Sequence, residues 1–205
     1  MIIFDFDGVL ADSLDSCLSA CNVAARAQGA EWAFEQDAFA TLNPLTFEAL
    51  AERHGLQPET FARDVAAAVS ANPDVPAVFD GICDALSDLA QTHALIVVSA
   101  SHASVIRSVL KASDADHHFT RIVGGDTPGS KAEKISELVA DKTAERHVMV
   151  GDAVSDILAA RAAGIGAIGV CWGWQASSQL LAHDPDAIAQ TPQDLAQVCR
   201  SVLDA

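Results

Sequence analysis

The sequence predicts an α/β fold in which a doubly wound parallel sheet carries a large helical insertion after its first strand. Short, continuously apolar segments recur along the chain, and most of them precede a segment with the apolar spacing of a helix. Continuous rather than alternating apolar runs are expected of parallel strands that are buried on both faces. About ninety residues separate the first two runs, which is far more than one crossover helix requires.

One strand of the sheet is expected at each short apolar run. The expected strands are residues 2–6, 95–99, 121–123, 147–150, 167–170 and 187–189. Helices are expected between the later strands, at residues 101–111, 130–140 and 155–163. Gly164 is placed to end the last of these, because glycine readily adopts the left-handed conformation of a helix terminus. Asp12 and Ser13 are expected to cap the first helix of the insertion.

The insertion itself predicts a separate helical unit. Helices are expected at residues 14–27, 34–42, 46–54, 59–71 and 79–90. We expect this unit to join the sheet near residues 11–14 and 72–77. The sequence therefore predicts a catalytic core of residues 1–12 and 76–205, with residues 13–75 forming a helical cap.

Composition limits the classes of partner. The chain has 205 residues, with 12 Lys and Arg against 28 Asp and Glu, which gives a formal net charge of -16. A field of this sign disfavours nucleic acid and anionic membranes, so we expect neither as a partner. No apolar run is long enough to span a bilayer. The same field repels phosphate, so a phosphorylated substrate requires local cations.

The first residues and the cysteines predict a cytoplasmic protein. The start, MIIFDFDG, has no basic segment and no small-residue cleavage site, so no signal peptide is expected. The five cysteines form no zinc-binding pattern and no disulfide framework, as expected of buried thiols in a reducing compartment. The sequence leaves open whether the chain is a monomer or a homodimer.

Polar side chains follow the ends of several predicted strands. Asp5 and Asp7 follow the first strand, and Ser99 follows the second strand. Asp152 and Asp156 follow the fourth strand, and Lys131 begins the helix that precedes this fourth strand. In a doubly wound sheet, ligands bind beyond the carboxyl ends of the strands. Crowded carboxylates raise one another's pKa unless a cation compensates them. Hard oxygen ligands without His or Cys favour Mg²⁺, so we expect a magnesium site at this edge.

Four segments resemble the motifs of the haloacid dehalogenase superfamily, in the family's order. Residues 5–13 (DFDGVLADS) resemble the first motif, Ser99 the second, Lys131 the third and residues 151–156 (GDAVSD) the fourth. Residues 156–164 (DILAARAAG), followed by residues 169–173 (GVCWG), are also similar to phosphoglycolate-phosphatase-like members. The resemblance covers both sides of the insertion. It implies a Mg²⁺-dependent phosphatase, a hydrolase with a Rossmann-like core and a helical cap.

The resemblance also implies a role for each matching residue. Asp5 is expected to be the nucleophile that forms an aspartyl-phosphate, and Asp7 the general acid and base. Ser99 and the backbone N–H of Ala100 are expected to bind phosphate oxygens. Lys131 is expected to neutralise charge on the nucleophile and on the transferred phosphoryl group.

The resemblance implies a metal site formed by Asp5, Asp152, Asp156 and the backbone carbonyl of Asp7, in which Asp156 holds the metal's water or orients its neighbours. Two features depart from the family's pattern. Ala100 stands where Asn often follows the second motif, and no Pro follows the lysine of the third motif. Lys134, one helical turn further on, is therefore a competing candidate, although the position of Lys131 at the helix start favours Lys131.

The leading functional prediction is hydrolysis of a small phosphomonoester, either phosphoglycolate-like or a sugar phosphate. Only Arg26, Arg53 and Arg63 are basic between Ser13 and Asp80, which favours a small metabolite with a single phosphate group. A phosphomutase resembling β-phosphoglucomutase is an alternative with the same motifs. A non-enzymatic phospho-accepting or binding protein on the same scaffold is the other alternative.

Overall fold

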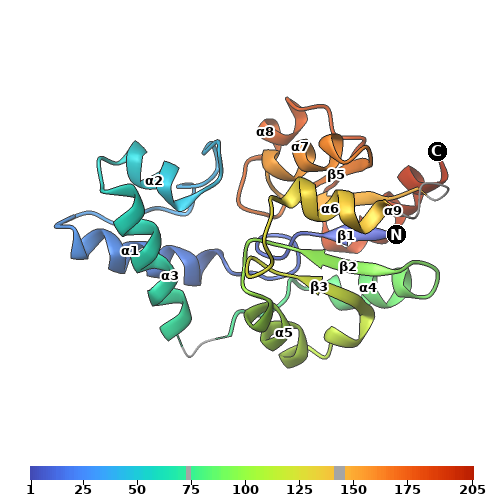
Figure 1. Ribbon diagram of the computed structural model, residues 1–205, viewed down its shortest axis with the longest axis horizontal. Coiled ribbons are helices and arrows are strands. Elements are labelled where there is room, and N and C mark those ends of the chain that lie inside the picture. The colour runs from blue at the N-terminus through green and yellow to red at the C-terminus, as the bar shows by residue number, and fades with distance from the viewer. Residues whose placement is uncertain (73–74, 141–145) are drawn as a thin grey trace.

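In a computed structural model, which describes residues 1–72, 75–140 and 146–205, the predicted strands form one six-stranded parallel sheet (Figure 1). The strands are β1 (Ile2–Phe4), β2 (Leu95–Val98), β3 (Phe119–Val123), β4 (Val148–Gly151), β5 (Gly166–Val170) and β6 (Ala187–Ala189). Their order is β3-β2-β1-β4-β5-β6, and every neighbouring pair is parallel. The chain therefore builds outward from β1 in both directions, which confirms the doubly wound fold.

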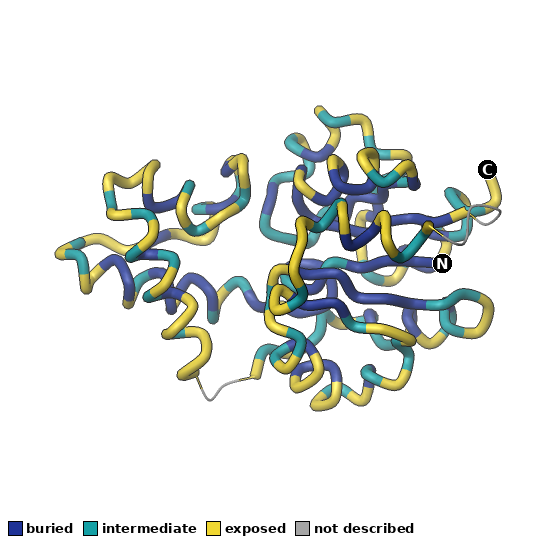
Figure 2. Tube along the Cα trace, in the orientation of Figure 1, coloured by how far each residue is buried: buried dark blue, intermediate teal, exposed yellow. Residues whose placement is uncertain are grey.

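Helices cover both faces of this sheet. Ile2 and Phe4 pack with α4 (Ile82–Ala90), α5 (Ala103–Ala112) and α9 (Leu195–Asp204). Ile3, whose side chain points to the opposite face, packs with α6 (Lys131–Val139), α7 (Val154–Ala162) and α8 (Ser177–Leu181). Figure 2 shows the central strands as continuously buried. This two-sided burial explains why the strands read as unbroken apolar runs.

The insertion contributes α1 (Leu14–Ala27), α2 (Phe47–Arg53) and α3 (Pro58–Ala71), which share a hydrophobic cluster of their own. Figure 1 shows these helices beyond the carboxyl ends of the strands. The predicted second connection to the sheet includes residues 73–74, which lie outside the described residues. None of the described helices is long and apolar enough to cross a membrane.

The predicted helix at residues 34–42 is wrong. This segment is a chain of tight turns, with backbone hydrogen bonds from Ala38, Ala40 and Leu42 to the carbonyl three residues earlier. Both Phe34 and Phe39 are buried in the cluster of the insertion. In a helix their side chains would point roughly 140° apart, so only a non-helical path allows both to be buried in this cluster.

A buried glutamine connects the insertion to the core. Gln175, in the loop after β5, is 2% exposed. Its Oε1 accepts a hydrogen bond from the backbone N–H of Val154 at 2.7 Å, and its Nε2 donates to the carbonyl of Leu42. The next residue, Ala176, donates its N–H to the carbonyl of Ala40 at 2.9 Å. The loop therefore holds the turns of the insertion against the first turn of α7.

We expect Gln175→Leu to destabilise the protein by about 2–4 kcal/mol, because it leaves the Val154 N–H and the Leu42 carbonyl without their partner. Urea unfolding measures this loss. Gln197→Leu, at an exposed position of α9, is the matched control and should change stability by less than about 0.5 kcal/mol. Equal effects of the two substitutions would show that the connection contributes nothing.

Candidate active site

The site begins where β1 ends. The N–H of Asp5 donates to the carbonyl of Val150 at 2.9 Å, so the β1–β4 ladder continues as far as Asp5. The N–H of Phe6 then donates to Oδ1 of Asp5 at 2.8 Å, which orients the carboxylate. A turn at Gly8 follows, with φ at 73°. The Asp5 side chain is therefore held at the carboxyl edge of the central strand.

Asp7 lies between two serine hydroxyls. Ser13 donates to its Oδ1 at 2.7 Å, and Ser101 donates to its Oδ2 at 2.5 Å. Burial raises the pKa of Asp7, although both hydrogen bonds oppose the shift. Ser13 is the N-cap residue of α1, but its side chain does not cap the helix, because the Ser13 hydroxyl bonds to Asp7 instead.

Three carboxylates meet beside this segment. Asp5, Asp152 and Asp156 each offer an oxygen, and these oxygens lie within 4.8 Å of one another. Asp152 and Asp156 are each 1% exposed. The N–H of Trp174 donates to Oδ2 of Asp152 at 2.7 Å. The structure thus brings together side chains from the end of β1 and from both sides of the β4–α7 junction.

One lysine contacts two of these carboxylates. Nζ of Lys131 lies 2.8 Å from Oδ2 of Asp5 and 2.5 Å from Oδ1 of Asp156. A capping box between Ser130 and Glu133 starts α6 at this point, which places Lys131 at the helix terminus nearest the carboxylates. Lys134 donates instead to the carbonyl of Gly124 at 3.0 Å. Of the two candidate lysines, Lys131 is therefore the one that lies among the carboxylates.

The charges of this cluster do not balance. Burial raises the pKa of Asp152 well above its usual value, and repulsion from Asp156 and Asp5 adds to the shift. Burial also raises the pKa of Asp156, although Lys131 opposes the shift. Burial alone would lower the pKa of Lys131, but Asp156 and Asp5 outweigh it and raise that pKa. One ammonium cannot neutralise three carboxylates, so a further cation would be favourable in this cluster.

Glycines make the close approach of the backbone to these carboxylates possible. A Cβ added at Gly8 would lie 2.2 Å from Oδ2 of Asp152, and one at Gly173 would lie 2.1 Å from Cβ of Asp152. A Cβ added at Gly151 would lie 2.2 Å from Cβ of Asp156. The buried carboxylates thus form a tightly enclosed set of hard oxygen donors. Such a set fits Mg²⁺.

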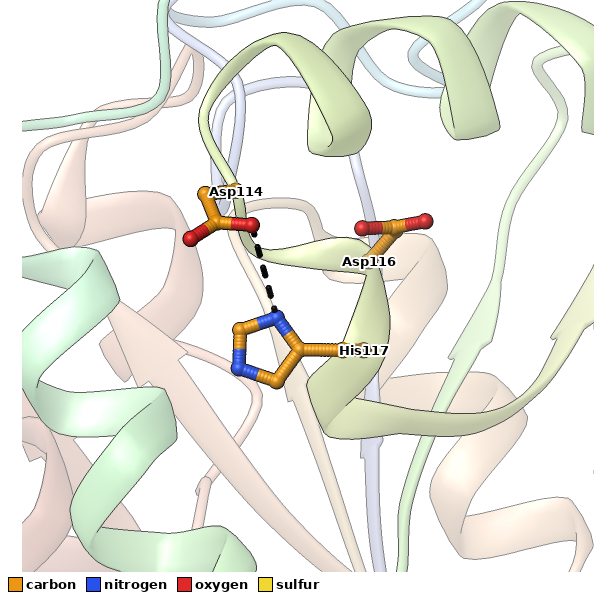
Figure 3. Close-up of side chains that lie close together, drawn as sticks. All are labelled: Asp114, Asp116 and His117. Atoms are coloured by element: carbon orange, nitrogen blue, oxygen red, sulfur yellow. Dashed lines mark ion pairs between the residues drawn. The ribbon is translucent and has the colours of Figure 1, made fainter.

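A second group of possible ligands lies elsewhere. Asp114, Asp116 and His117 surround the turn before β3, and Figure 3 shows their side chains near one another. Nδ1 of His117 lies 3.9 Å from Oδ1 of Asp114. All three residues are exposed, so water already solvates their charges. Unlike the buried cluster, this group does not need a cation for its charges to be tolerated.

Ser99 and Ala100 lie where β2 ends. Ser99 is 4% exposed, and its Oγ accepts a hydrogen bond from the N–H of Ser101 at 3.2 Å. Ala100 is exposed and lines a cavity of about 540 Å³ between the insertion and the core. Asp7 lines the same cavity. Of the predicted site residues, Asp7 and Ala100 are therefore the two that line this cavity.

Reasoning from the sequence missed the partners that orient the site. Ser101, Trp174 and Gln175 are not among the residues that the motifs predict. No local signal identifies Gln175, whose partners are distant in the sequence.

Known proteins are similar to this chain in sequence. Residues 2–170 match the model of the family described as haloacid dehalogenase-like hydrolase. The chain is 31% identical over 208 residues to a phosphoglycolate phosphatase of Synechococcus elongatus, an alignment that covers 98% of each protein. It is 28% identical over 221 residues to a probable phosphatase, IndB, of Dickeya dadantii, covering 99% of this chain and 94% of that one.

Solved structures agree in fold. A haloacid dehalogenase-like hydrolase from Streptococcus pneumoniae superposes with a TM-score of 0.82 at 23% identity, covering 96% of each chain. A predicted phosphoglycolate phosphatase from Haemophilus somnus superposes with a TM-score of 0.78 at 22% identity, covering 97% of each chain. With the family match extending over most of its length, the chain belongs to the haloacid dehalogenase-like hydrolases and is a phosphatase of that family.

Proposed function

We propose that this phosphatase depends on Mg²⁺ and hydrolyses a small phosphomonoester through an aspartyl-phosphate on Asp5. The observation that carries the proposal is the position of Asp5, which contacts Lys131 and lies with Asp152 and Asp156 in one buried cluster. Phosphoglycolate and a sugar phosphate are reference compounds for the assay, because three of the similar proteins are named phosphoglycolate phosphatases. The alcohol part that this chain prefers is a separate question, which depends on the cavity beside Asp7.

In the first step, a carboxylate oxygen of Asp5 attacks phosphorus and the bond from phosphorus to the ester oxygen breaks. Asp7 donates its proton to the departing alcohol oxygen. The raised pKa of Asp7 supports this role, because it favours the protonated acid. Ser13 and Ser101 hold the carboxyl group in place. Lys131 stabilises the charge on the transferred phosphoryl group.

In the second step, water attacks the phosphorus of the aspartyl-phosphate. Asp7, now ionised, accepts the proton of that water, and the Asp5 carboxylate leaves as inorganic phosphate forms. We assign Ser99 and the N–H of Ala100 to binding phosphate oxygens. Both residues follow β2, next to β1 in the sheet.

For Mg²⁺, we assign the side chains of Asp5, Asp152 and Asp156 and the backbone carbonyl of Asp7 as ligands. Bound there, the ion would neutralise charge on the phosphate group. The side chain of Asp7 is engaged by two serines, which supports a ligand role for its carbonyl rather than its carboxylate. We also propose that residues 1–12 and 76–205 form the catalytic core and that residues 13–75 form the cap. The cap would exclude water during the reaction.

Asp5→Asn should reduce phosphate release from a small phosphomonoester by roughly a thousandfold or more, because it removes the nucleophile while preserving the shape of the side chain. Phosphate release in the presence of Mg²⁺ measures the effect. Asp12→Asn, at an exposed position of the same segment, is the matched control and should retain activity. Substantial activity in Asp5→Asn would falsify the aspartyl-phosphate route. A requirement for a bisphosphate sugar would instead favour the mutase.

Asp152→Asn should raise the thermal midpoint of the metal-free protein, because it removes one of three mutually repelling carboxylates while the amide oxygen can still accept the Trp174 hydrogen bond. Mg²⁺ should raise the midpoint of the wild-type protein and have little effect on Asp152→Asn. Calorimetry measures both quantities. If Mg²⁺ stabilises the two proteins equally, Asp152 is not a ligand.

The stabilisation by Mg²⁺ should also depend on pH. Because the folded-state pKa values of Asp152 and Asp156 lie above the usual value, the folded protein binds more protons than the unfolded chain in that range. The stability that these protons provide is present at low pH and is lost as the pH rises through the raised values. Mg²⁺ should therefore raise the thermal midpoint more at about pH 8 than at about pH 5.

A further inference from the structure

The cavity between the cap and the core is lined mainly by apolar side chains. Phe47 of α2, Val69 of α3 and Val105 of α5 line it, together with Trp174 from the loop after β5. Its volume of about 540 Å³ lies within the range of small-molecule sites. Asp7 and Ala100, which we assign to acid catalysis and phosphate binding, also line this cavity. The group bound in the rest of the cavity is therefore the alcohol part of the ester.

The cavity has no Lys or Arg among its described lining residues. His102 also lines it, and Nδ1 of His102 accepts a hydrogen bond from the N–H of Ser104 at 3.3 Å.

The arginines of the cap do not line this cavity. Arg53 donates to the side chain and the carbonyl of Thr41, and Arg63 pairs with Asp64 at 2.9 Å. Arg26 lines a different depression. A carboxylate on the alcohol part would thus enter an apolar space near Asp7 without a counter-charge, in a protein with a net charge of -16.

Most serine hydroxyls of the cavity wall already donate a hydrogen bond to another group of the protein. Ser13 and Ser101 donate to Asp7, Ser16 to the carbonyl of Ser13, and Ser70 to the carbonyl of Ala66. A polyol would lose its hydrogen bonds to water on entering, and these four hydroxyl protons are not available to its oxygens in exchange. An apolar group loses nothing of this kind and gains from burial.

We infer that the alcohol part of the substrate is uncharged and largely apolar, so that phosphoglycolate and sugar phosphates are poor substrates of this chain. This inference rests on the proposed phosphatase site and narrows its substrate class. The recognised compound is a monoester of phosphate with a small aliphatic or aromatic alcohol. Its phosphate binds beside Asp5, and its carbon skeleton lies between Val69 and Val105.

Four esters with alkyl leaving groups test this inference: n-propyl phosphate, phosphoglycolate, benzyl phosphate and glycerol 1-phosphate. Propyl phosphate and phosphoglycolate are similar in size and differ mainly in the carboxylate. We expect kcat/KM to be at least roughly tenfold higher for propyl phosphate than for phosphoglycolate, and higher for benzyl phosphate than for glycerol 1-phosphate. A kcat/KM for phosphoglycolate equal to or above that for propyl phosphate overturns the inference and leaves the proposed phosphatase intact. Failure to hydrolyse any of the esters with Mg²⁺ present contradicts the proposed function itself.

A cation placed in the cavity wall tests the same inference independently. Val69 is 40% exposed, so Val69→Lys should fold, and it should raise kcat/KM for phosphoglycolate relative to propyl phosphate by roughly tenfold. Val23→Lys, in α1 and outside this cavity, makes the same change of charge at a residue that is 56% exposed. The ratio should be unchanged in Val23→Lys. An equal rise in both variants, or no rise in Val69→Lys, contradicts the assignment of this cavity to the alcohol.

Discussion

Mutual repulsion among crowded carboxylates is the constraint on which this site depends. Asp5, Asp152 and Asp156 approach one another within 4.8 Å, and Asp152 and Asp156 are buried where little water can solvate them. Lys131 offsets part of that repulsion through its contacts with Asp5 and Asp156. The cluster stores an unfavourable interaction that a bound cation would relieve. Affinity for a divalent ion and the positioning of a nucleophile thus have the same physical origin.

The surrounding backbone is built to tolerate this crowding. The sheet order places the ends of β1 and β4 side by side, so residues about 150 positions apart meet without any long loop. Gly8 and Gly173 let two loops approach Asp152 directly. The loop after β5 then serves both units, since Trp174 binds Asp152 while Gln175 holds the turns of the insertion. The cap and the charged cluster therefore share one structural support.

The predictability of each part followed from the range of the interactions that determine it. The bounds of α1 and the strands agree closely with expectation, because local apolar spacing already reflects burial on one or two faces. The segment at residues 34–42 did not form the expected helix, because two buried phenylalanines pack into one cluster. The Ser13 side chain likewise bonds to Asp7 instead of capping a helix. In both cases a tertiary partner prevailed over a local preference.

The sequence by itself determined the alternation of buried strands and helices, the place of the insertion and the set of chemically capable residues at the strand ends. These properties depend on side-chain type and spacing, which are local. Only the tertiary structure decided which lysine meets the carboxylates, which serines hold Asp7 and how apolar the cavity beyond them is. These depend on how distant segments pack, because a contact between two side chains is decided by the positions of both and not by the sequence around either one.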